Sequence, residues 1–250
     1  MNNLNGKIAF VSGGGRGIGA AAALTLARQG AKVAVNYVRQ AESAQAVVEQ
    51  IRQEGGEAEA VRADVRDPEQ VERSLAHIRA MWGDIDILVN NAHMSFVMKP
   101  LIALQWEELA QKLNDELRVA FTLTQSVLPA MMERKYGRII YISSDAAEVA
   151  LPYMAAHGSA KGALNSFAKY VALESASYGI TANIVSPGLV QTDASGDTPE
   201  AIKQQVAAMT PLQRVAVPDD IAGAIAFLAS EESRFITGTR ISVNGGLYMN

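Results

Sequence analysis

The stretch that most constrains the fold is the glycine-rich segment Val11-Ser12-Gly13-Gly14-Gly15-Arg16-Gly17-Ile18-Gly19. It follows a short apolar run, residues 8–11, that predicts a buried strand, and it precedes an alanine-rich run, residues 20–27, that predicts a helix. Glycines permit a tight turn, and the free N–H groups at a helix N-terminus attract phosphate. The order strand, glycine turn, helix predicts a dinucleotide site; the alternative is a turn that only packs the helix on the strand.

Composition restricts the class of protein. The 250 residues contain no Pro/Ser/Gly-rich linker, so we expect a single domain over residues 1–250. A net charge of −4 argues against a nucleic-acid surface, and the absence of cysteine excludes disulfides and thiolate metal sites. No signal-peptide pattern and no apolar run of about 20 residues is present, so we expect a cytoplasmic protein that does not enter a membrane.

Strand and helix patterns alternate along the first half of the chain. Strands are predicted at 32–37, 59–64 and 85–92. Helices are predicted at 40–54 and 67–82, the second with Asp67 as N-cap and Pro68 in its first turn. This alternation is typical of an α/β fold with a doubly wound parallel sheet, the Rossmann arrangement, with helices on both faces.

The end of the second strand favours one cofactor. An acidic residue there binds the ribose 2′-hydroxyl of NAD, but this chain has Asn36-Tyr37. Arg39 follows, and Arg16 lies in the glycine turn, so two cations are available for a 2′-phosphate. We therefore predict NADP(H). The alternative is that Arg39 is only the solvated start of the next helix.

The motifs along the whole chain resemble those of the short-chain dehydrogenase/reductase family, and most closely the β-ketoacyl-acyl-carrier-protein reductase branch. They are Ser12-Gly13-x-x-x-Gly17-x-Gly19, Asp64-Val65, Asn90-Asn91-Ala92, the segment 136–144 that ends in two serines, the strand and loop 183–192, and the C-terminal segments 236–238 and 243–246. The resemblance implies a single NADP-binding Rossmann domain of about seven parallel strands, with a substrate lid at about 194–211. Within the lid, residues 200–209 predict a short helix, and residues 218–229 predict another helix after it.

The resemblance also implies a set of cofactor contacts. The predicted phosphate and adenine contacts are Ser12, Gly13, Arg16, Gly17, Ile18, Gly19, Arg39, Asp64 and Val65. The predicted contacts of the nicotinamide half are Asn91, Lys161, Val190 and Thr192. It further implies a homotetramer built on the long helices at about 116–134 and 152–177. The implied reaction is reduction of a 3-oxoacyl-thioester-like carbonyl, free or on an acyl-carrier protein, in fatty acid or polyketide metabolism.

The catalytic set departs from the family pattern at three positions. Ser144 and Lys161 match the family's serine and lysine. His157 stands in place of the tyrosine, Glu116 in place of the asparagine, and His93 in place of a glycine. These positions surround one pocket in the family, so the departures affect the chemistry together.

Four interpretations stay open. His157 replaces the tyrosine as proton donor, because histidine has an ordinary pKa of about 6.5; the reduction rate then falls as pH rises through that pKa. Tyr153, eight residues before Lys161, serves an enoyl-thioester reductase. The chain binds NADP(H) without catalysis, which an ion pair between Lys161 and Glu116 favours. His93, Glu116 and His157 bind a metal, although their spacing fits no known motif.

Overall fold

The computed structural model describes residues 4–196 and 198–249, and in these residues seven strands form one parallel sheet. The strand order is β3-β2-β1-β4-β5-β6-β7, which confirms the predicted doubly wound fold. The strands are β1 (Ile8–Val11), β2 (Lys32–Tyr37), β3 (Ala58–Arg62), β4 (Ile87–Asn90), β5 (Gly137–Ile142), β6 (Ile180–Pro187) and β7 (Arg240–Val243).

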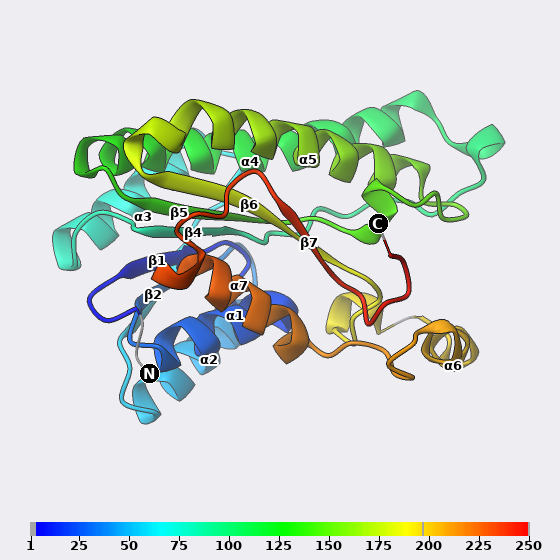
Figure 1. The fold of residues 1–250 in the computed structure, drawn as a ribbon, viewed down its shortest axis with the longest axis horizontal. Coiled ribbons are helices and arrows are strands. Elements are labelled where there is room, and N and C mark those ends of the chain that lie inside the picture. The colour runs from blue at the N-terminus through cyan, green and yellow to red at the C-terminus, as the bar shows by residue number, and fades with distance from the viewer. Residues whose placement is uncertain (1–3, 197, 250) are drawn as a thin grey trace.

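Helices cover both faces of the sheet. In Figure 1, α3, α4 and α5 lie over one face, and α1, α2 and α7 lie over the other. The helices are α1 (Gly17–Arg28), α2 (Ala41–Gln53), α3 (Pro68–Met81), α4 (Trp106–Arg134), α5 (Ala155–Ser175), α6 (Glu200–Met209) and α7 (Pro218–Ala229). Each layer has its own apolar core, so the central strands are buried on both sides.

The direction of winding reverses between β1 and β4. Successive strands after β1 are added on one side up to β3, and the chain then returns to place β4 on the other side of β1. The loops that leave β1 and β4 therefore diverge and open a crevice at the carboxyl ends of the strands. The glycine segment and the Asn90-Asn91-Ala92 motif lie at this crevice.

The helix predicted from about residue 116 begins ten residues earlier, at Trp106. A capping box explains the early start: the backbone N–H of Gln105 donates to Glu108 Oε2 over 3.0 Å, and the Gln105 side chain caps the first turn. The helix thereby includes Lys112, one turn before Glu116. This placement decides the electrostatics of the site.

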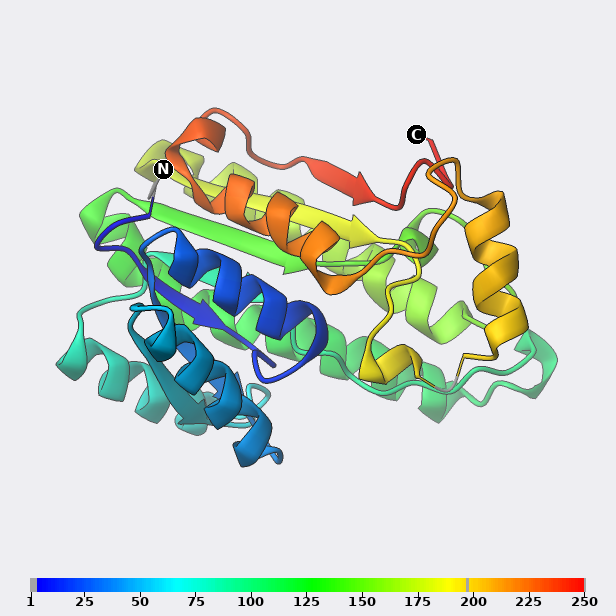
Figure 2. The same ribbon diagram turned by 90° about the horizontal axis from the view of Figure 1, so that it is seen from below.

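The segment predicted as a lid contains α6, whose bounds coincide with the predicted helix at 200–209. Figure 2 shows α6 beyond the carboxyl ends of the strands. Asp197, which the predicted lid includes, lies outside the described residues. No described helix combines the length and the apolar character needed to cross a membrane.

Candidate active site

The glycine segment forms a close turn between β1 and α1. Gly13 and Gly17 have φ values of +61° and +53°, a region that favours glycine. A Cβ at Gly19 would overlap the Gly13 carbonyl oxygen and lie 2.5 Å from Asn91 Nδ2. The Arg16 side chain at the N-cap of α1 does not cap the helix, and no acidic residue lies in the first turn of α1. The turn therefore presents backbone and helix-dipole charge suited to a phosphate.

The end of β4 holds this turn in place. Ser12 Oγ donates to the Val89 carbonyl oxygen over 3.2 Å and accepts from the backbone N–H groups of Asn91 and Ala92, each over 2.9 Å. Asn91 Nδ2 in turn donates to the carbonyl oxygens of Ser12 and Gly13. Asn91, predicted to border the nicotinamide, thus also supports the glycine turn.

Asn36 has a structural role that sequence reasoning missed. Its buried side chain accepts from the Gly13 backbone N–H over 3.2 Å and donates to the Val61 and Ala63 carbonyl oxygens. The Gly14 N–H donates to the Asn36 backbone oxygen over 2.9 Å. Asn36 therefore positions the glycine turn from β2, where the sequence showed only the absence of a carboxylate.

The predicted adenine side of the crevice carries unpaired cations. The side chains of Arg16 and Arg39 are exposed and form no ion pair with any residue that the structure describes. The Asp64 carboxylate is instead engaged by Arg66 over 2.7 Å, which holds the pKa of Asp64 below its usual range. Val65, next to it, is buried.

The loop after β6 also approaches the glycine turn. A Cβ at Gly17 would lie 3.2 Å from Thr192 Cγ2. Val190 is buried, and Ser195 Oγ donates to its carbonyl oxygen over 2.6 Å. Thr192 thus lies against Gly17 of the turn, and cofactor contacts by Val190, Thr192 and Ile18 stay predictions.

Ser144 and Lys161 meet at the carboxyl end of β5. Ser144 follows that strand and caps a short 3₁₀ turn, where its Oγ accepts from the Ala146 N–H over 3.2 Å. Accepting this bond leaves the hydroxyl hydrogen of Ser144 available to a ligand. Lys161 Nζ donates to the Ile142 carbonyl oxygen over 2.6 Å, so α5 is fixed to the end of β5.

A buried Lys–Glu–Lys network occupies the floor of the site. Glu116 Oε1 accepts from Lys161 Nζ over 2.5 Å, and Glu116 Oε2 accepts from Lys112 Nζ over 2.6 Å. Lys112 also donates to the Met94 carbonyl oxygen over 2.7 Å. All three charged side chains are at most 6% exposed. The network is the ion pair anticipated for Lys161 and Glu116, enlarged by a lysine that the sequence analysis did not single out.

The electrostatics of this network follow from its burial. Burial alone would raise the pKa of Glu116, but Lys161 and Lys112 outweigh it and lower that pKa to about 2. Burial lowers the pKa of Lys112, and Glu116 opposes that change. With one carboxylate between two ammonium groups, the network has a formal charge of +1 when both lysines are protonated. This positive charge stabilises negative charge that develops on a nearby group during a reaction.

His157 packs in an aromatic cluster with the loop after β4. Its ring stacks on Phe96 with 4.4 Å between centroids and 23° between planes, and His93 lies 6.1 Å from it. His157 Nδ1 is buried and has no hydrogen-bond partner among the described residues. The structure thus brings His93 and His157 together, with Phe96 covering one face of the His157 ring.

The same surroundings keep His157 neutral. Burial lowers the pKa of its ring to about 3, and the ammonium groups of Lys161 and Lys112 add to the effect. Sequence reasoning assumed the ordinary value of about 6.5. Within the fold, an imidazolium near neutral pH is therefore not available from His157, and its ring acts as a neutral hydrogen-bonding group.

Tyr153 lies apart from this network in the loop before α5. Its φ is +65°, its side chain is 55% exposed, and its carbonyl oxygen accepts from the Lys99 N–H over 3.2 Å. As for the metal hypothesis, the described residues contain no group of three or more His, Cys, Asp or Glu side chains suited to an ion. Glu116 is committed to its two lysines.

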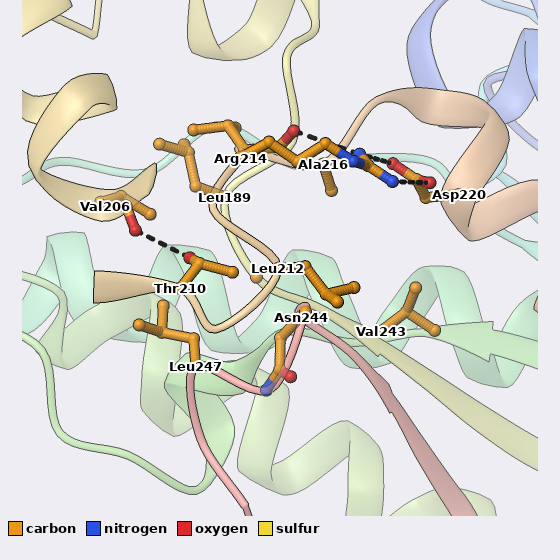
Figure 3. A pocket seen from close by; sticks show the side chains of 13 residues that line it. Leu189, Val206, Thr210, Leu212, Arg214, Ala216, Asp220, Val243, Asn244 and Leu247 are labelled. Carbon is orange, nitrogen blue, oxygen red and sulfur yellow. Dashed lines mark hydrogen bonds and ion pairs between the residues drawn. The ribbon is translucent and has the colours of Figure 1, made fainter. Parts of the chain in front are cut away.

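A cavity of about 160 Å³ lies beside the lid helix. Figure 3 shows apolar side chains of Leu189, Val206 and Leu247 around it, and the Arg214–Asp220 ion pair at one side. None of the predicted catalytic residues lines this cavity. It adjoins the loop after β6, which the sequence analysis assigned to the nicotinamide side.

Comparison with known proteins identifies the family. A sequence profile described as enoyl-(acyl carrier protein) reductase matches residues 13–248. The 3-oxoacyl-[acyl-carrier-protein] reductase FabG of Escherichia coli is 39% identical over 247 residues, 99% of this chain and 99% of that one. FabG of Staphylococcus aureus is 36% identical over 245 residues, 97% of this chain and 98% of that one. The chain belongs to the short-chain dehydrogenase/reductase family.

Solved structures agree with this family. A candidate gluconate dehydrogenase from Agrobacterium tumefaciens superposes with a TM-score of 0.92 at 34% identity, covering 100% of this chain and 99% of that one. A dehydrogenase/reductase from Sinorhizobium meliloti has a TM-score of 0.88 at 38% identity, covering 99% and 97%. The chain is thus an oxidoreductase of the NAD(P)-dependent short-chain class, and its glycine cradle fits the nicotinamide dinucleotide that the family uses.

Lys112 and Asn36 are the two residues that sequence reasoning missed. Lys112 had a detectable signal, because it stands four residues before Glu116 and such pairs face each other on a helix. Asn36 had none, because its partners lie in the turn after β1 and at the end of β3. The role of Asn36 needed the packing of distant segments, whereas the Lys112–Glu116 pair is local to α4.

Proposed function

We propose that this chain is an NADPH-dependent reductase of a 3-oxoacyl-thioester-like carbonyl, with Ser144 and Lys161 in their family roles and His157 at the tyrosine position. The observation that carries the proposal is the convergence of Ser144, Lys161 and a buried positive network at the end of β5. Carbonyl reduction places negative charge on the substrate oxygen, and donors already fixed in a dry site stabilise that charge.

The chain's own residues divide this work. The Ser144 hydroxyl donates to the carbonyl oxygen, since its Oγ already accepts from Ala146 N–H. Lys161 binds the nicotinamide ribose with the N–H that Glu116 and Ile142 leave free. His157 contributes a neutral hydrogen bond, and the proton that completes the alcohol comes from solvent water, because all three N–H donors of Lys161 are then engaged. The bound cofactor supplies the hydride.

The proposed choice of NADPH rests on charge at the adenine side. Arg16 and Arg39 are exposed and lack acidic partners among the described residues, while the Asp64 carboxylate is taken by Arg66. Guanidinium groups suit a 2′-phosphate. We propose that Arg39 provides the larger part of this preference, because it follows β2 directly.

The proposed substrate class rests on the relatives and on the lid. FabG of Escherichia coli is named as a 3-oxoacyl-[acyl-carrier-protein] reductase. The cavity beside α6, with Leu189 and Val206 in its wall, suits a short acyl chain. We extend the proposal to an acyl-carrier-protein substrate, a cytoplasmic setting and a lid that closes over the bound molecules.

The deciding experiment measures cofactor binding and turnover together. Binding of NADPH and NADH to the wild-type chain and to Arg39→Ala is compared first; we expect NADPH to bind more tightly, and Arg39→Ala to narrow the difference. NADPH oxidation is then followed with acetoacetyl and crotonyl thioesters side by side. We expect turnover of the acetoacetyl thioester.

Other outcomes select other functions. Turnover of the crotonyl thioester alone would indicate that the chain is an enoyl reductase that uses Tyr153. Enoyl reductase is also the activity in the description of the matching family profile. Cofactor binding without turnover of either thioester would favour a silent NADP(H)-binding protein, the candidate that the Lys161–Glu116 ion pair supports. Equal affinity for both cofactors would contradict the choice of NADPH.

A further inference from the structure

Lys112 is a buried lysine to which the proposed reaction assigns no contact with cofactor or substrate. Its side chain is 1% exposed and sits on α4, one turn before Glu116. Burying an ammonium group costs free energy unless the group is paired and hydrogen-bonded. Lys112 meets that condition with two acceptors, Glu116 Oε2 and the Met94 carbonyl oxygen. Its position therefore depends on the same carboxylate that Lys161 uses.

Counting donors shows what Lys112 does for Lys161. An ammonium group has three N–H donors and no acceptor. Lys161 donates two of these N–H groups, one to Glu116 Oε1 and one to the Ile142 carbonyl oxygen. One donor of Lys161 remains, because the second oxygen of Glu116 is already satisfied by Lys112.

We propose that Lys112 is a positioning residue of the active site: it shares the Glu116 carboxylate and thereby keeps one N–H of Lys161 free for the nicotinamide ribose. The inference rests on the proposed function, in which Lys161 is the ribose ligand. It explains how a glutamate is accommodated at a position where the family has a neutral asparagine.

Removing Lys112 would redirect the carboxylate. Glu116 Oε2 would be left buried without a partner, and an unsatisfied buried charge is costly. The one remaining N–H of Lys161 is the donor already beside it, so Glu116 would accept from two of the three N–H donors of Lys161, and Ile142 from the third. Lys161 would then have no N–H left for a ligand, and the network would lose its formal charge of +1.

Lys112 also fixes the loop that covers His157. The Met94 carbonyl oxygen that it binds lies between His93 and Phe96, the two residues that pack on the His157 ring. Lys112 Nζ is 5.6 Å from the centre of the Phe96 ring, within range of a cation–π contact. One side chain thus joins the loop after β4 to the Glu116–Lys161 pair.

The test is the dissociation constant of NADPH, measured by calorimetry for the wild-type chain, Lys112→Met, Lys112→Arg, Glu116→Gln and the double variant Lys112→Met/Glu116→Gln. We expect Lys112→Met to weaken NADPH binding about 10- to 100-fold, the value of one hydrogen bond to a charged group. Lys112→Arg should keep the affinity within about threefold, because it retains the charge. In the Glu116→Gln background, Lys112→Met should change the affinity less than about threefold, since no carboxylate competes for Lys161.

Lys99→Met is the matched control. Lys99 also pairs with a glutamate of α4, Glu108, but its side chain is 40% exposed, and we expect no change in NADPH affinity. Thermal unfolding of each variant reports whether it folds. If Lys112→Met does not fold, the comparison within the Glu116→Gln background decides alone: a loss of affinity there overturns the proposal.

Failure of the role of Lys112 and failure of the proposed function give different results in this experiment. Equal binding by the wild-type chain and folded Lys112→Met overturns the role of Lys112 and leaves the proposed function standing. Equal weakening by Lys112→Met in both backgrounds shows that Lys112 acts without Glu116, which also overturns it. A wild-type chain that binds neither NADPH nor NADH overturns the proposed function, and this inference with it.

Discussion

At the scale of the residue, His157 shows how surroundings change a side chain's chemistry. The same imidazole that titrates near 6.5 in a peptide has a pKa of about 3 beside Lys161 and Lys112 in a buried site. Burial and the two cations act in the same direction. A histidine at the tyrosine position is therefore not equivalent to an acid that titrates at neutral pH.

This shift predicts a pH dependence of stability. Because the folded pKa of His157 lies below the unfolded value, the unfolded state binds a proton that the folded state rejects, and stability falls as pH decreases from about 6.5 toward 3. The loss from His157 between pH 7 and pH 5 is about 2 kcal/mol. The low pKa of Glu116 affects stability only below about 4.5, outside this interval.

The contribution of His157 to the pH dependence of stability is measured by urea denaturation of the wild-type chain and of His157→Gln at pH 7 and pH 5. We expect the variant to lose about 2 kcal/mol less unfolding free energy across the interval, because glutamine does not titrate. Identical pH dependence of the two chains would show that His157 keeps an ordinary pKa in the fold. His93 is present in both chains, so its contribution cancels.

At the scale of the element, the turn between β1 and α1 depends on close backbone approach. Gly19 packs against the Gly13 carbonyl oxygen and the Asn91 amide, and neither neighbour is free to move, because Asn91 also holds Ser12. The turn, the end of β4 and Asn36 of β2 therefore form one rigid unit.

We expect Gly19→Ala to destabilise the fold by about 1–3 kcal/mol through overpacking and to abolish dinucleotide binding. Gly223→Ala is the matched control, because Gly223 also lies in a helix, α7, but a Cβ there would meet no atom within 4 Å. The control should gain about 0.5–1 kcal/mol from helix propensity. Chemical denaturation and NADPH calorimetry measure both effects, and a Gly19→Ala chain that binds NADPH like the wild type would contradict the argument.

At the scale of the whole molecule, the outer face of α4 and α5 carries apolar side chains that the chain alone does not bury. Phe121, Tyr170 and Leu173 are 51%, 62% and 76% exposed. A shallow groove between the two helices runs past Phe121, Phe167 and Tyr170. Subunit contacts are predicted on these two helices, and the predicted homotetramer would cover this face.

We expect the wild-type chain to elute as a tetramer in size-exclusion chromatography with light scattering, and Tyr170→Glu to form smaller species, because a buried unpaired charge opposes association. Met81→Glu, at a 45% exposed position on α3, is the control that should leave the tetramer intact. A monomeric wild-type chain would contradict the prediction.

The sequence by itself determined the fold and the frame of the site. The glycine segment, the alternation of strands and helices, and local caps such as Asp67 and Pro68 are short-range signals, and they predicted β1, β2, α6 and α7 with the bounds that the structure has. The same motifs predicted the family that the comparisons confirm.

Tertiary structure decided the electrostatics. Glu116 and Lys161 are 45 residues apart, and Lys112 became their partner only because α4 begins at Trp106 and packs against α5. The pKa of His157 depends on burial and on the charges of Lys161, one turn along α5, and of Lys112 on α4. Of these causes, only Lys161 lies near residue 157 in the sequence. Local patterns specify elements, whereas desolvation and long-range pairing exist only once those elements have packed.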